Sequence, residues 1–270
     1  MNIDLHGFGA YAYTGGKPFD PKLPGVVFVH GALNDHSVWA LQSRYLAHHG
    51  RAVLAVDLPA HGRSAGAPLG VEQAGRWITS LVEASGLRRT ALVGHSMGSL
   101  IALEAASHLG ERASALVMVG TAYPMKVSAK LLELCQRDAL AAIDLVNVLS
   151  NSTHAAKPSN PGPGSSTRGG ARALSRRMQR GYAGGNLFHA AFAACDAYAG
   201  LEGAASKIRC PVTLVLAERD QMTPAQAAAP VIAALKPRVV TLPVGHNLMG
   251  EAPDGVLNAI NEALSQEPRR

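Results

Sequence analysis

One serine in this chain stands where it could act as a nucleophile. The segment Gly94-His95-Ser96-Met97-Gly98 follows an apolar run, Ala91 to Val93, and precedes a stretch with helical spacing of apolar residues. A sharp strand-to-helix turn of this kind exposes a serine hydroxyl, and the flanking glycines relieve the crowding that it causes. Because this hydroxyl is a weak nucleophile at neutral pH, it also needs a base and donors for an oxyanion. The pattern predicts Ser96 as a catalytic nucleophile.

A second Gly-x-Ser-x-Gly match, Gly62-Arg63-Ser64-Ala65-Gly66, is the weaker candidate. It follows Pro59 and leads into Pro68, which is typical of a loop. Because a strand should precede the nucleophile and a helix should follow it, we expect Ser64 to have no catalytic role. Asp57 ends the preceding strand, and we expect it to tie down the loop that leads to Ser64.

His246 is the predicted general base. It follows the last predicted strand, residues 238–242, and Gly245 before it leaves the main chain free to turn. A histidine that takes the serine proton is oriented by a carboxylate, and these groups reach one site from different strand ends. The alternative interpretation is a loop histidine hydrogen-bonded to the main chain.

Asp220 is the predicted carboxylate, because it follows the strand predicted at 211–217 and precedes His246 in the chain. The order serine, acid, histidine is the one expected when a strand-to-helix turn carries the serine. Two other carboxylates compete with it. Glu218 lies nearer the strand end, and Asp254 is placed to cap the last helix.

Two main-chain N–H groups are predicted to stabilise the oxyanion. One belongs to Met97, directly after the serine, and the other to Ala32, in the loop after the apolar run that ends in His30-Gly31. Four apolar side chains flank these loops, and they either line a substrate pocket or pack an insertion onto the core: Trp39, Tyr123, Met125 and Leu248.

The elements that would position these residues alternate between short apolar strands and helical stretches over residues 25–120 and again from 211 onward. This alternation predicts an α/β fold, a mostly parallel twisted sheet with helices on both faces. Residues 5–13 suggest an early antiparallel strand or hairpin at the sheet edge. Thr223 and Pro224 predict the first cap and first turn of another helix.

No strand is predicted between residues 123 and 207. We interpret this region as a helical cap or lid insertion over the strand ends, within a core domain formed by 1–122 and 208–270. The passage 157–170 is rich in proline, glycine and serine, so we expect a flexible loop there.

Composition favours an ordinary globular protein. The chain has 270 residues, 47% of them hydrophobic and 16% charged, with a net charge of +6. No run approaches a membrane span and no secretory signal is evident at the N-terminus. The cysteines are odd in number and have no metal-type spacing, so we expect reduced thiols, no metal site and a cytoplasmic location: Cys135, Cys195 and Cys210.

The basic residues do not favour a nucleic-acid partner. Arg172, Arg176 and Arg180 recur every four residues, which is typical of one solvated helix face. No aromatic residues alternate with them. We therefore expect a small-molecule substrate and neither a nucleic-acid nor a membrane partner.

Taken together, these motifs resemble the α/β-hydrolase fold superfamily, in its serine-nucleophile, esterase-like branch. The resemblance rests on residues 30–32, the loop 57–64, the turn 94–98, Asp220 and Gly245-His246, and the insertion falls where this superfamily carries its cap domain. It implies hydrolysis of an ester or related acyl bond, as in esterases, lactonases, thioesterases and carbon–carbon bond hydrolases, without a metal or organic cofactor.

At several positions the chain differs from the residues typical of particular subfamilies, and these differences reduce the number of activities that we expect. His95 and Asn247 stand where ring-fission hydrolases typically have asparagine and tryptophan, and Leu33-Asn34 departs from the glycine- and proline-rich loop of proline iminopeptidases. Dehalogenases and epoxide hydrolases have aspartate in place of Ser96. Ester hydrolysis is therefore the main hypothesis. The rivals are cofactor-free perhydrolysis by the same residues and a non-catalytic small-ligand-binding protein.

Overall fold

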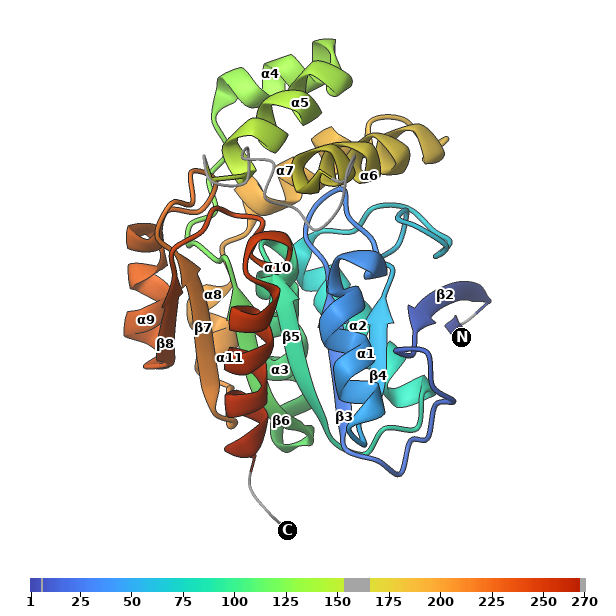
Figure 1. Cartoon of the computed structure of the whole chain (residues 1–270). Coiled ribbons are helices and arrows are strands. Elements are labelled where there is room, and N and C mark those ends of the chain that lie inside the picture. The colour runs from blue at the N-terminus through green and yellow to red at the C-terminus, as the bar shows by residue number, and fades with distance from the viewer. Residues whose placement is uncertain (6, 153–165, 268–270) are drawn as a thin grey trace.

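The computed structural model describes residues 1–5, 7–152 and 166–267. Its described part contains an eight-stranded sheet in the order β1-β2-β4-β3-β5-β6-β7-β8 (Figure 1). The strands are β1 (Asn2–Leu5), β2 (Phe8–Tyr13), β3 (Gly25–Val29), β4 (Ala52–Val56), β5 (Thr90–His95), β6 (Ala113–Val119), β7 (Val212–Ala217) and β8 (Arg238–Leu242). Strands β3 to β8 pair in parallel, whereas β1 and β2 form an antiparallel hairpin at one edge. The predicted α/β class is confirmed.

Helices cover both faces of the sheet. Helices α1, α10 and α11 pack on one face, and α2, α3, α8 and α9 pack on the other. Their bounds are α1 (Ala40–His48), α2 (Val71–Ala84), α3 (Met97–Leu109), α4 (Ala129–Arg137), α5 (Ala139–Ser150), α6 (Thr167–Gly181), α7 (Leu187–Ala197), α8 (Leu201–Ala205), α9 (Ala229–Leu235), α10 (Leu248–Glu251) and α11 (Pro253–Ser265).

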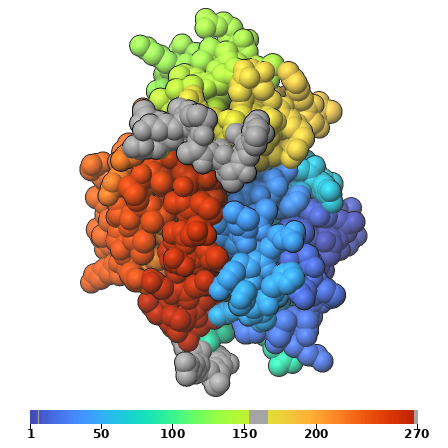
Figure 2. All heavy atoms as spheres, viewed as in Figure 1, coloured from blue at the N-terminus to red at the C-terminus, as the bar shows by residue number. Residues whose placement is uncertain are grey.

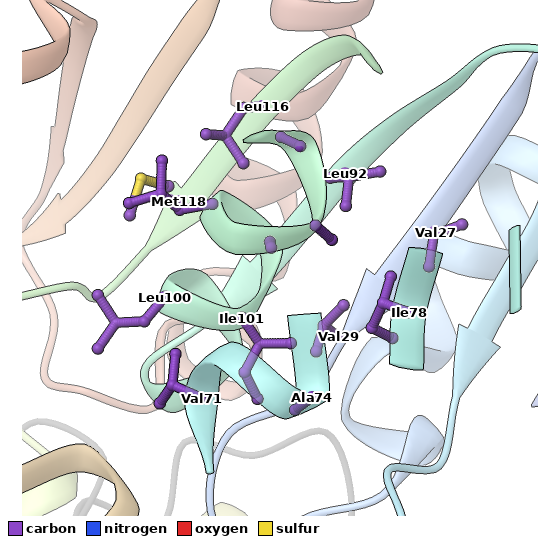
Figure 3. Close-up of a cluster of buried hydrophobic side chains, with 14 of the residues drawn as sticks. Val27, Val29, Val71, Ala74, Ile78, Leu92, Leu100, Ile101, Leu116 and Met118 are labelled. Atoms are coloured by element: carbon purple, nitrogen blue, oxygen red, sulfur yellow. The ribbon is translucent and has the colours of Figure 1, made fainter. Parts of the chain in front are cut away.

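The central strands are buried on both faces because each side of the sheet has its own apolar cluster. In β3, Val27 and Val29 join the cluster under α2 and α3, while Val26 and Phe28 join the cluster under α1 and α11. Figure 3 shows the first cluster, where Ile78 of α2 and Ile101 of α3 lie close to the strand valines. This two-sided burial explains why the strands have continuous apolar sequences, as in other parallel sheets.

Helices α4 to α7, which we call the cap helices, lie over the carboxyl ends of the strands (Figures 1 and 2). They have an apolar core of their own, which includes Leu131, Ile143, Phe188 and the core-loop residue Leu33. Helix α8 lies within the predicted insertion 123–207, but it packs against α3 and α9 on the face of the sheet.

The predicted loop at 157–170 is only partly described. Residues 157–165 lie outside the described residues, and the expectation is wrong for 167–170, which form the first turn of α6. The Ser166 hydroxyl caps this turn by accepting the Gly169 N–H at 3.0 Å. A good cap and the arginine- and alanine-rich sequence that follows outweigh the low helix propensity of two glycines.

The arginines of α6 are largely engaged with carboxylates. Arg172 and Arg176 both contact Asp144 of α5, and their hydrogen bonds lower the pKa of this carboxyl to about 2. Arg177 reaches the buried Asp35 of the core at 2.9 Å and so links the cap to the sheet domain. Among the described helices, none is both long and apolar enough to cross a membrane.

The turn after β5 should be intolerant of a larger residue at Gly98. A Cβ atom there would lie 2.5 Å from the Val29 carbonyl oxygen and would also collide with that of His30. We expect Gly98→Ala to lower the free energy of unfolding by about 3 kcal/mol, measured by urea denaturation.

The matched control is Gly170→Ala in α6. A Cβ atom there would meet nothing within 4 Å, so this variant should gain up to about 1 kcal/mol of helix stability. Equal unfolding midpoints for the two variants would contradict the packing described at Gly98.

Candidate active site

Ser96 joins β5 to α3 in a strained turn. Its backbone has φ 53° and ψ −123°, in the left-handed region that side-chain-bearing residues rarely adopt. The Ser96 N–H donates to the Val119 carbonyl of β6 at 2.9 Å, which fixes the turn to the sheet. Only glycine fits at Gly94, because a Cβ atom there would strike the main chain of Gly98. The packing therefore maintains the strain and presents the side chain of Ser96 at the strand end.

The loop after β3 runs directly beside Ser96. A Cβ atom on Gly31 would lie 3.2 Å from that of Ser96, so the main chain of this loop approaches the serine closely. The buried His30 ring holds the loop by donating from Nδ1 to the Gly31 carbonyl at 2.7 Å and accepting the Leu58 N–H at Nε2, at 3.0 Å. In the described part of the chain, the Ala32 N–H has no hydrogen-bond partner.

His246 and Asp220 form a buried pair behind this serine. The Nδ1 atom of His246 lies 2.8 Å from Asp220 Oδ2, and the Asp220 carboxylate also accepts the N–H groups of Met222 and Thr223 at 2.8 and 2.7 Å. Burial raises the pKa of Asp220, but the attraction of His246 and these hydrogen bonds outweigh it and lower the pKa below its usual value. Asp220 is therefore a stable anion that orients the imidazole.

Thr223, which the sequence predicted as a helix cap, contacts both members of this pair. Its hydroxyl donates to Asp220 Oδ2 at 2.8 Å and lies 3.1 Å from His246 Nδ1. The predicted capping of a helix by Thr223 is wrong, because the chain first forms a 3₁₀ turn at Ala225–Ala228 and α9 begins only at Ala229.

His95, beside the serine, contacts the histidine loop. Its Nε2 lies 2.9 Å from the His246 carbonyl, and the two rings lie 4.7 Å apart. A carbonyl only accepts, so Nε2 carries the hydrogen, and the buried Nδ1 has no partner in the described residues. Burial, with the nearby His246 ring as a smaller cause, lowers the pKa of His95 to about 3. A neutral His95 therefore ties the turn at Ser96 to the loop that carries His246.

The cap also holds the histidine loop. The Asn247 N–H donates to the Ser150 carbonyl at the end of α5, at 2.8 Å. Glu251 accepts the Ser152 N–H at 2.9 Å and the Gly245 N–H at 3.3 Å, so one carboxylate joins the cap to the loop. Sequence reasoning missed Glu251, because nothing in its local pattern points to residues about a hundred positions away.

Ser96 and His246 face one cavity of about 340 Å³ beneath the cap helices. Asp220 lies behind His246 and does not line it. Of the four predicted pocket residues only Met125 is in the lining, and the expectation for the other three is corrected here. Trp39 is fully buried against Phe28, Tyr123 packs on Tyr198 outside the cavity, and Leu248 is buried under α11.

Ser64 does not line the cavity, and its hydroxyl is engaged in hydrogen bonds with the main chain. Its hydroxyl donates to the Asp57 carbonyl at 2.6 Å and accepts the Tyr11 N–H at 2.9 Å. Asp57 also accepts the Arg63 N–H at 2.9 Å and binds His36, so it ties down the loop as expected.

The cysteines are free, and Cys195 lines the cavity with a pKa that burial raises to about 12. A thiol with so high a pKa is a poor nucleophile. Among the described residues, no group of three or more histidine, cysteine, aspartate or glutamate side chains could hold a metal ion.

Comparison with known proteins agrees with this architecture. Residues 26–259 match the model of the alpha/beta hydrolase family, and the chain belongs to this family. The resemblance expected from the sequence motifs is thus confirmed at the level of the family.

Curated relatives match only part of the chain. A Mycobacterium phage D29 protein, named provisionally as a non-heme haloperoxidase, is 32% identical over 99 residues, which are 36% of each chain. The acetyltransferase component of an acetoin cleaving system from Pseudomonas putida is 31% identical over 36% of this chain and 26% of its own. The matches thus span about a third or less of these relatives.

Solved structures match along nearly the whole chain. An esterase from Thermogutta terrifontis superposes with a TM-score of 0.79 at 19% identity, covering 98% of this chain and 97% of its own. The enol-lactonase from Burkholderia xenovorans LB400 has a TM-score of 0.76 at 17% identity, covering 98% and 100%. At these identities the likeness shows a common fold.

Two neutral, buried histidines should make the protein sensitive to acid. Burial lowers the pKa of His61 and His95 from 6.5 to about 3. Between these values the unfolded chain binds protons that the folded chain does not. Stability should therefore fall as the pH falls, by about 1.4 kcal/mol per pH unit for each histidine.

Urea unfolding between pH 4 and 6 tests this expectation with His61→Gln, which should lose about 1.4 kcal/mol per pH unit of the slope. The exposed His48 provides the control, since His48→Gln should leave the slope as it is. An unchanged slope in His61→Gln would show that His61 is protonated in the folded protein.

Proposed function

We propose that this protein hydrolyses a carboxylic ester or a related acyl bond of a small molecule through an acyl-enzyme on Ser96. One observation carries the proposal. The strained turn that presents Ser96 shares a cavity wall with His246, and the Nδ1 atom of His246 lies 2.8 Å from the buried Asp220 carboxylate. A nucleophile, a base and an orienting acid in this arrangement perform acyl transfer.

In the proposed reaction, His246 takes the hydroxyl proton of Ser96 at Nε2 while the serine oxygen attacks the acyl carbon. The tetrahedral oxyanion lies against the N–H groups of Ala32 and Met97. The unpartnered Ala32 N–H supports this assignment, as does the position of Met97, whose N–H opens α3 and precedes any intrahelical acceptor. As the intermediate collapses, the bond to the leaving group breaks, and His246 returns its proton to that group.

Water completes the cycle. It attacks the acyl carbon of the ester on Ser96 and gives a proton to His246, which then protonates the departing serine oxygen. Asp220 stays ionised throughout and stabilises the imidazolium, while Thr223 holds the carboxylate in place. Each of these steps uses a side chain or an N–H group of the chain itself.

The same residues would also serve lactone, thioester or carbon–carbon bond hydrolysis and perhydrolysis. A fluorophosphonate probe separates all of these from a ligand-binding protein, because only an activated serine is labelled quickly. A cytoplasmic location stays a prediction from the unpaired cysteines.

Replacing the nucleophile is the first test. With p-nitrophenyl esters of short acids, Ser96→Ala should lose about 10⁶-fold in kcat and all fluorophosphonate labelling, because the proposed acyl-enzyme forms on the Ser96 hydroxyl. Ser64→Ala removes the other serine in a Gly-x-Ser-x-Gly segment and should keep both. Esterase activity that survives in Ser96→Ala would overturn the proposal.

The hydrogen bonds around Asp220 give a graded second test. We expect Asp220→Asn to lower kcat by about 10⁴-fold, because the amide favours the wrong imidazole tautomer. Thr223→Val should lower kcat by about tenfold with KM little changed, since it removes one hydrogen bond to a carboxylate. Thr241→Val on the exposed side of β8 is the control. A Thr223→Val variant with unchanged kcat would remove Thr223 from the site.

A further inference from the structure

The cavity beneath the cap has two chemically different ends. Helix α5 runs along it over about 10 Å, and its lining residues are Ile143 and Val146 toward its start and Asn147, Leu149 and Ser150 toward its end. Each end of the helix also meets a different part of the core. The apolar end adjoins the loop that carries Ala32, and the other end adjoins His246, so the two ends suit the acyl half and the alcohol half of an ester, respectively.

The apolar end is continuous with the loop that carries Ala32. Leu33, directly after Ala32, packs in one cluster with Ile143, Leu131 and the stacked rings of Phe188 and Phe192. All five of these side chains are at most 8% exposed, and all five line the cavity.

The other end carries three asparagines beside His246, which we call the amide wall: Asn147, Asn151 and Asn247. Asn247 donates from Nδ2 to Asn151 Oδ1 at 3.3 Å, and Asn151 donates from Nδ2 to the Asn147 carbonyl at 2.7 Å. In the described part of the chain, the side-chain amide of Asn147 has no partner. It is therefore free to donate to and accept from a ligand.

Other polar residues also line the cavity, but no hydrogen bond in the described part of the chain joins their side chains to the amide wall: Asn34, Ser128, Ser175 and Gln221. Lys126 is the one charged side chain in the described lining, and its ammonium donates to the Asp196 carbonyl at 2.8 Å and lies 3.8 Å from the Asp196 carboxylate. The described lining thus places a linked set of amides beside His246 and holds no unpaired charge for an ionic group.

We propose that the substrate is an ester of an apolar acyl group with a neutral alcohol that carries further hydroxyl or amide groups. This inference rests on the proposed function and specifies its substrate. Because His246 returns its proton to the leaving oxygen, the alcohol must lie beside His246 and hence against the amide wall. The acyl chain then extends past the loop that carries Ala32, toward Leu33, Ile143 and Phe188.

The test compares esters that share one acyl chain: 1-octanoylglycerol, propyl octanoate and octanoylcholine. We expect kcat/KM to be at least about tenfold higher for the glycerol ester than for either of the others, the effect of one hydrogen bond to the bound alcohol. Asn147→Leu should abolish this ratio. Val148→Leu, one residue along α5 and exposed, should keep it.

Binding to Ser96→Ala, measured by calorimetry with the same intact esters, reads the preference without turnover. Hydrolysis of all three esters at similar rates would overturn this inference and leave the proposed function intact. Absence of ester hydrolysis, with tenfold tighter binding of the glycerol ester that Asn147→Leu removes, would overturn the proposed function and uphold the division of the cavity. An equal affinity for the three esters would overturn the inference.

Discussion

The close approach of three main-chain segments around Ser96 is the constraint on which the site depends. The ends of β3 and β5 and the first turn of α3 pack so tightly that glycine is required at Gly94 and Gly98, and a Cβ atom at Gly31 would meet His95 and Ser96 at 3.1–3.2 Å. This packing holds Ser96 at φ 53° and brings the Ala32 loop beside it. Because a buried sheet with apolar clusters on both faces fixes these segments, the strain is borne by the whole core.

The second half of the site is held by contacts between segments that are far apart in the chain. His95 reaches the carbonyl of His246, and Asp220 holds the opposite side of the same residue through its ring. Glu251 and Ser150 then fix the residues on either side of His246. His246 is thereby restrained through its carbonyl, its ring and its two neighbours, which leaves the imidazole little freedom to rotate away from the cavity.

Sequence patterns predicted what local physics determines. Continuous apolar runs predicted the parallel strands, and the placement of Ser96, Asp220 and His246 after strand ends agrees with the positions that they occupy in the fold. The patterns failed where the outcome depends on contacts across the chain. Trp39 turns into the core because a short 3₁₀ helix directs it onto Phe28, and neither feature has a periodic signal.

Thr223 shows the same limit at the site itself. A threonine before a proline predicts a helix cap. Here the Thr223 hydroxyl instead donates to the carboxylate of Asp220, three residues earlier, which is itself hydrogen-bonded to His246 from another loop. The amide wall is equally invisible in the sequence, because Asn147, Asn151 and Asn247 belong to segments that meet only when the cap folds onto the core.

The contacts of Ser150 and Ser152 with the histidine loop also bear on how such a protein can be recombined. Helix α5 ends at Ser150, whose carbonyl accepts the Asn247 N–H. Ser152, two residues further along the chain, donates its N–H to Glu251. A cap transplanted from another member of the family would break these bonds unless residues 245–251 came with it. The unit that would have to be exchanged together is therefore the cap and the segment 245–251, which carries His246, although the two are about a hundred residues apart in the chain.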